Sequence, residues 1–148
     1  MLTIAPTLTA LALPGTPGPA PILVLEADQT VAALVQVVLA EAGFVTHCLA
    51  PWDDARVLRT LAARHPAAVL LTSRAGAGTG SVWARAPWLH AQDPAVPLVL
   101  CTADGQVAAE AAAGTSARSR AARVAAVVRK PFDLDALVAT ISRVVAPP

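Results

Sequence analysis

Five short apolar runs alternate along this chain with stretches in which apolar residues recur every three or four positions. The runs are residues 21–26, 44–49, 67–72, 96–102 and 124–129, and the intervening stretches indicate helices at 28–42, 53–64, 83–90, 106–113 and 133–146. Each run is continuous rather than alternating, which is typical of strands buried on both faces of a parallel sheet. The predicted fold class is therefore α/β: a flavodoxin-like, doubly wound parallel sheet of five strands in the order 2-1-3-4-5, with helices on both faces.

Smaller features refine this prediction. Gly43 is expected to end the first helix in a left-handed conformation, and Pro87 is expected to break the third helix. The first 20 residues carry no charge and are rich in Pro and Ala. We expect residues 1–20 to be a disordered tail, or a segment included only because the start codon was placed too far upstream. A single domain is expected at residues 21–146.

Composition and charge exclude several classes of partner. Eleven basic and ten acidic side chains give a net charge of +1, so bulk charge indicates neither nucleic acid nor a membrane surface. No apolar run reaches the ~18 residues that a membrane-spanning helix needs, and we predict a cytoplasmic protein. Cys48 and Cys101 lie in apolar runs without metal-ligand spacing, which favours buried thiols over a disulfide.

Polar side chains follow four of the predicted strands. In the predicted order the carboxyl ends of these strands meet at one edge of the sheet, where open α/β folds place their functional groups. The residues there are Glu26, Asp28, Thr72, Ser73, Thr102 and Lys130. Lys130 is the only lysine in the chain, and every other fixed positive charge is an arginine. Because the sequence otherwise uses arginine in place of lysine, this one compact ammonium group indicates a specific role, either in a functional site or in the structure.

Four segments carry a resemblance to a known family. They are KPFDLDAL at 130–137, ILVLEAD at 22–28, PAAVLLT at 66–72 and PLVLCTA at 97–103. Together they resemble the receiver domain of bacterial response regulators in two-component signalling, over residues 21–145. The resemblance implies a phosphorelay: phosphoryl transfer from a phosphohistidine to an aspartate after the third strand, assisted by Mg²⁺.

The resemblance assigns roles residue by residue. Thr102 would be the hydroxyl and Lys130 the lysine that bind the phosphoryl group, and Pro131 would follow a cis peptide bond. Glu26 would be the first member of the acidic pair that binds Mg²⁺. Two positions depart from the family, because the second acidic position is Ala27 and the phosphoacceptor position is Thr72.

These departures predict a degenerate receiver, or pseudo-receiver. An acyl phosphate cannot form on a threonine, and no Asp or Glu occurs from residue 55 to residue 92. We therefore predict no catalytic residue, no metal, no cofactor and no enzyme activity, with Lys130 bonded to Glu26, Thr72 or Thr102. Two other interpretations stay open: regulation by a Ser/Thr kinase at Thr72 or Ser73, and a small flavodoxin-fold enzyme.

The predicted role is that of a stand-alone protein-interaction module. The partner would bind the face formed by the fourth helix, fifth strand and fifth helix, and a homodimer through the same face is possible. Arg118, Arg120 and Arg123 lie nearby, in a stretch from residue 111 to residue 132 that contains no acid. We expect this stretch to be solvated and partly disordered; an acidic protein partner is the next interpretation, and nucleic acid the last.

Overall fold

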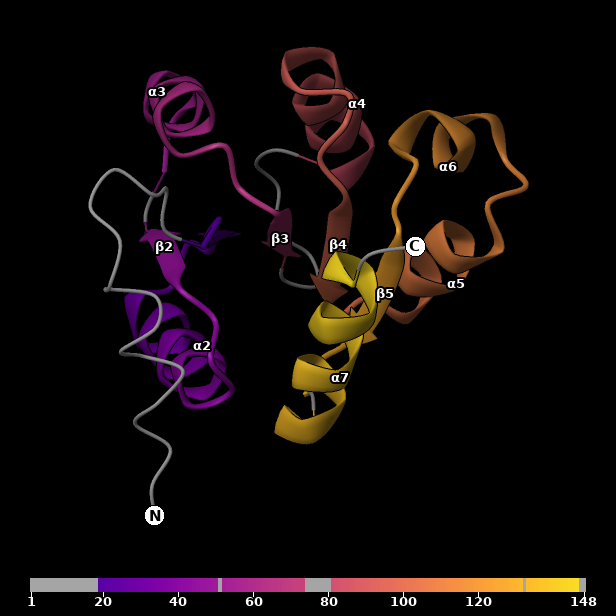
Figure 1. The fold of residues 1–148 in the computed structure, drawn as a ribbon. Coiled ribbons are helices and arrows are strands. Elements are labelled where there is room, and N and C mark those ends of the chain that lie inside the picture. Colours follow the sequence, from indigo (N-terminus) through magenta and orange to yellow (C-terminus); the bar gives the residue numbers. More distant parts are fainter. Residues whose placement is uncertain (1–18, 51, 74–80, 132, 147–148) are drawn as a thin grey trace.

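The five apolar runs form the predicted parallel sheet (Figure 1). The structure is a computed structural model that describes residues 19–50, 52–73, 81–131 and 133–146. Most of the predicted tail at 1–20 and the glycine-rich stretch at 76–80 lie outside the described residues. The strands run in the order β2-β1-β3-β4-β5, and every neighbouring pair is parallel. They are β1 (Ile22–Leu25), β2 (Thr46–Leu49), β3 (Ala68–Ser73), β4 (Leu98–Thr102) and β5 (Ala126–Arg129).

Helices connect the strands and cover both faces of the sheet. They are α2 (Gln29–Glu41), α3 (Asp54–Arg64), α4 (Val82–Gln92), α5 (Gly105–Ala113), α6 (Ala117–Ala122) and α7 (Leu134–Val145). Figure 1 shows α2 and α7 below the sheet and α3, α4 and α6 above it, with α5 beside β5. Each helix starts at an Asp or Ser whose side chain accepts a hydrogen bond from a backbone N–H of the first turn. Asp133 caps α7 in this way, as the sequence predicts.

Alternate residues of each strand enter two separate cores. Ile22 and Val24 of β1 pack with α2 and α7, whereas Leu23 and Leu25 pack with α3 and α4. All four side chains are at most 1% exposed. The continuous apolar run of β1 therefore fills both faces of the sheet, which explains why it shows no alternation.

Two expectations about the helices were wrong. Pro87 does not break the third helix but lies inside α4. A proline in a helix removes one backbone hydrogen bond at a cost of about 3 kcal/mol. Ala86 and Leu89 on either side of it are fully buried, and burial of this face outweighs the local cost.

The basic stretch after α5 is also more ordered than expected, because it contains α6. Ser116 and Ser119 form a capping box in which each side chain accepts a hydrogen bond from the other's backbone N–H. His90 of α4 donates from Nε2 to the carbonyl of Ala122 at 2.8 Å. Ala122 itself is fully buried, so α6 is held against α4 by both contacts.

Further details match or correct the predicted pattern. Gly43 has a φ of +96° just after α2, as expected of a left-handed helix end. Leu34 of α2 and Leu58 of α3 are exposed although both belong to the apolar pattern that predicts these helices. None of the helices in the described part of the chain is long and apolar enough to cross a membrane.

Candidate functional site

At the carboxyl ends of β1 and β5, the only lysine of the chain, Lys130, forms an ion pair with the buried carboxylate of Glu26. Nζ of Lys130 lies 3.3 Å from Oε1 of Glu26, and the two side chains are 15% and 3% exposed. Glu26 directly follows β1 and Lys130 directly follows β5. Of the three partners expected for the ammonium group, Glu26 is the one that its side chain reaches.

Glu26 is fixed from both of its carboxylate oxygens. Oε2 accepts a hydrogen bond from the backbone N–H of Asp28 at 2.9 Å, while Oε1 faces Lys130. The carboxylate of Asp28 points to α2 instead, where Oδ1 accepts from the N–H of Thr30 at 2.8 Å. Asp28 therefore caps a helix and does not replace the acidic group that is missing at Ala27, whose position is exposed.

The hydroxyl groups form a second set of contacts at the same edge. Thr102 is fully buried, and its Oγ1 accepts hydrogen bonds from Ser73 Oγ at 3.0 Å and from the N–H of Asp104 at 3.1 Å. Thr72 turns toward β1, where its hydroxyl donates to the carbonyl of Leu25 at 3.0 Å. Ser73, not Thr72, is thus the hydroxyl next to Thr102.

The strand-to-helix connection after β5 has the geometry that the resemblance implies. The Lys130–Pro131 peptide bond is cis. The N–H of Lys130 donates to the carbonyl of Thr102 at 2.9 Å, so the backbone rather than the side chain joins these two residues. Pro131 itself is exposed.

A buried thiol that the sequence did not place at the site lies close to this ion pair. Burial raises the pKa of the Cys101 thiol to about 11, with Lys130 lowering it and Glu26 raising it to smaller extents. Cys101 is 1% exposed and belongs to the core between the sheet, α2 and α7. The thiol is protonated at neutral pH and offers no nucleophile.

The residues present do not fit a Mg²⁺ site. Mg²⁺ requires several hard oxygen ligands in octahedral geometry. Only Glu26 offers a carboxylate from the expected positions, and its oxygens already engage Lys130 and Asp28. No group of three His, Cys, Asp or Glu that could hold a metal ion occurs within the described residues.

The arginines of α6 differ in their surroundings. Arg118 donates to both carboxylate oxygens of Glu110 at 2.7 Å, and its guanidinium group lies 4.6 Å from the ring centre of Trp83. The hydrogen bonds from Arg118, and then that from Ser116, lower the pKa of Glu110 to about 2. The charge of Arg118 is therefore neutralised within the protein.

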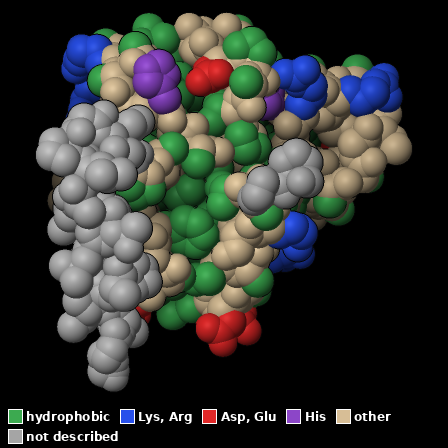
Figure 2. All heavy atoms as spheres, viewed as in Figure 1, with side chains coloured by type: hydrophobic (Ala, Val, Ile, Leu, Met, Phe, Trp, Pro, Cys, Tyr) green, Lys and Arg blue, Asp and Glu red, His purple; other side chains and the backbone are tan. Residues whose placement is uncertain are grey.

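Arg120 and Arg123 remain exposed at the surface. Arg120 donates to the carbonyl of Thr115, and Arg123 ends α6 in a left-handed conformation with a φ of +45°. Figure 2 shows basic side chains over α4 and α6 and a separate group over α3. The surface near α6 thus presents fewer free cations than the sequence indicates.

Comparison with known proteins bears on the fold. No protein-family model matches the sequence, and no curated protein matches it either. Solved structures do match, and receiver domains of response regulators are among them. The receiver domain of NtrX from Brucella abortus is 22% identical with a TM-score of 0.68, over 84% of this chain and 97% of that one. A putative response regulator from Chloroflexus aurantiacus is 21% identical with a TM-score of 0.67, over 87% and 99%.

A third similar structure is that of an atypical orphan response regulator described as having a new phosphorylation-independent regulatory mechanism. It is 12% identical with a TM-score of 0.63, over 84% of this chain and 94% of that one. The chain spans only about a quarter of the longer NtrX structures, at 27% of their length. These similarities establish the receiver-type flavodoxin-like fold.

Proposed function

We propose that this protein is a pseudo-receiver: a non-catalytic interaction module of a two-component-type signalling pathway that is not phosphorylated on aspartate. The observation that carries the proposal is the ion pair of Lys130 with Glu26 at the edge where a receiver would hold its phosphoryl group. A fixed carboxylate at this place neutralises the lysine permanently. The site then has a single state, whereas the site of a receiver alternates between an unphosphorylated and a phosphorylated state.

The phosphoacceptor position supports the same conclusion. Thr72 has a hydroxyl in place of the carboxylate on which an acyl phosphate forms, and that hydroxyl is engaged by Leu25. Of the three positions where a receiver holds its metal-binding carboxylates, only Glu26 has one. Regulation without phosphoryl transfer is consistent with the phosphorylation-independent mechanism described for the atypical orphan response regulator.

A direct test is exposure to acetyl phosphate and Mg²⁺, followed by intact-mass measurement. We expect no phosphoryl increment on the wild-type protein. A matched variant, Ala27→Asp with Thr72→Asp, restores two carboxylates and should gain Mg²⁺-dependent, acid-labile phosphate. Stoichiometric Mg²⁺-dependent labelling of the wild type would contradict the proposal.

The partner in this proposal is a protein that binds the face formed by α5, β5 and α7, or a second copy of this chain bound through that face. Exposed cations at the edge of this face, Arg120 and Arg123, favour an acidic partner. Capture experiments with the wild type and with an Arg120→Gln, Arg123→Gln variant test this assignment. Equal capture of one partner by both proteins would place the interface elsewhere.

A second candidate function is control by a Ser/Thr kinase. Ser73 and Thr72 are only half-buried, and a phosphate on Ser73 would lie next to Thr102. Each hydroxyl already donates a hydrogen bond, which a kinase would have to break. Acid-stable phosphate on either residue in protein purified from its own host would favour this function over the first.

A further inference from the structure

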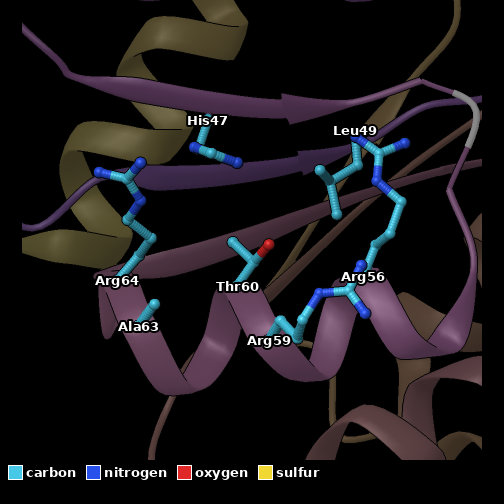
Figure 3. A pocket seen from close by; sticks show the side chains of 7 residues that line it. All are labelled: His47, Leu49, Arg56, Arg59, Thr60, Ala63 and Arg64. Atoms are coloured by element: carbon cyan, nitrogen blue, oxygen red, sulfur yellow. The ribbon is translucent and has the colours of Figure 1, made fainter.

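An open pocket lined by basic side chains lies between the edge strand β2 and helix α3 (Figure 3). Strand β2 contributes His47 and Leu49, and α3 contributes Arg56, Arg59, Thr60, Ala63 and Arg64. The pocket shares no residue with the Lys130–Glu26 site.

The sequence pattern of both elements creates this lining. Arg56, Thr60 and Arg64 are four residues apart, which places them on one face of the helix. His47 and Leu49 alternate along β2, so both side chains point to the same side of the sheet, toward α3. The buried apolar residues of α3, Val57 and Leu61, lie on a neighbouring face of the helix and anchor it to the sheet, and Thr60 at 9% exposure lies at the border of the two faces.

The positive charge of the pocket has no carboxylate within it. No Asp or Glu lines the pocket, and among the described residues neither Arg59 nor Arg64 has an acidic group within salt-bridge distance. Asp54 at the start of α3 is paired with Arg85 at 2.7 Å. Burial lowers the pKa of His47 most, and the positive charges of Arg64 and then Arg56 lower it further.

The cations are distributed along the pocket. Figure 3 shows Arg64 and His47 at one end, Arg56 and Arg59 at the other, and the hydroxyl of Thr60 between them. Arg59 and Arg64, one at each end, are about 7.5 Å apart along the helix axis. A ligand that contacts both of them is therefore an elongated anion with several negative charges.

We propose that this pocket binds an oligophosphate chain, either inorganic or carried by a nucleotide. Guanidinium groups pair with phosphate oxygens through two parallel hydrogen bonds, and Thr60 adds a hydroxyl at the middle of the chain. An acidic peptide is the other anion of this length. A peptide strand would add to β2 through backbone groups at its edge, whereas the pocket is lined by side chains of α3 and by those of β2 that face α3.

Titration calorimetry with tripolyphosphate, ATP and hexaglutamate at about 0.15 M ionic strength tests the proposal. The full chain is compared with Arg59→Gln, Arg64→Gln and Arg143→Gln. Arg143 is an exposed arginine of α7, on the opposite face of the sheet, and serves as a charge-matched control. Loss of one charge-assisted contact should weaken binding about tenfold.

We expect one-to-one binding of tripolyphosphate or ATP that weakens about tenfold in each pocket variant and less than twofold in Arg143→Gln. Whichever of the two phosphates binds more tightly identifies the source. In NMR spectra the His47 ring signals should shift on addition, which localises the ligand even where one variant fails to fold. Absence of saturable binding at millimolar concentration, an equal loss in Arg143→Gln, or tighter binding of hexaglutamate would overturn the proposal.

Discussion

Replacement of Lys130 by methionine tests whether the ion pair with Glu26 is structural. Methionine keeps the length and the apolar stem of the side chain but removes the ammonium group. The Glu26 carboxylate, with a side chain only 3% exposed, would then keep one hydrogen bond, from the N–H of Asp28. A buried carboxylate without its cation is poorly solvated, and the folded state should lose stability.

The expected magnitude follows from the burial of the two groups. Removing one member of a buried ion pair costs about 3–5 kcal/mol. The Lys130 side chain is 15% exposed, so water can partly replace it, and the Asp28 bond persists. We therefore expect a loss of about 2–3 kcal/mol in the free energy of unfolding, or a decrease in Tm of about 5–10 °C for a domain of this size.

Urea unfolding of four proteins measures this effect: the wild type, Lys130→Met, the double variant Glu26→Gln with Lys130→Met, and the control Arg143→Met. The double variant leaves no buried charge and should recover at least half of the lost stability. The exposed Arg143 should change stability by less than about 0.5 kcal/mol. The reasoning fails if Lys130→Met matches the wild type, or if the double variant is no more stable than the single one.

Three further predictions concern ionisable groups. The pKa of His47 lies below 6.5 because of burial and then of Arg64, so Arg64→Gln should raise this pKa in an NMR titration. Acidification through pH 6.5 should lower the stability of the wild type, because the unfolded state binds the proton more readily than the folded state. The pKa of Glu110 is about 2 because Arg118 donates to it, so its contribution to stability is complete above pH 4.5 and is lost as pH falls through 2; acid unfolding of Glu110→Gln should lack this dependence. Burial raises the pKa of Cys101 to about 11, so a thiol reagent at pH 8 should label it only after urea unfolding; rapid labelling of the native protein would contradict that burial.

The sheet could be predicted from the sequence because parallel strands carry a strong pattern. The run at 96–102, for example, became β4 at Leu98–Thr102, with an error of only two residues at one end. The helix pattern failed where tertiary contacts outweigh local preference. Pro87 is tolerated in α4 because its neighbours are buried, and α6 forms because a serine capping box and a contact from His90 hold a stretch that has no apolar stripe.

The site could be predicted only to the level of strand ends. Topology alone brings Glu26 and Lys130 to one edge, and the structure joins them. The choice between Thr72 and Ser73 as the neighbour of Thr102 depends on where β3 ends and on side-chain rotamers, which leave no trace in the sequence. The arginines of α3 did show a spacing that indicates a basic face, but the docking of α3 beside β2 was needed to make a pocket of it.

The contact between Lys130 and Glu26 also has a consequence for folding. The two residues are 104 positions apart, and they meet only when the first and last strands to be synthesised occupy the same sheet. Contacts of such long separation are costly in loop entropy and tend to form after the local ones. We therefore expect Lys130→Met to accelerate unfolding more than it slows folding, since the ammonium group reaches its partner only once the sheet is complete.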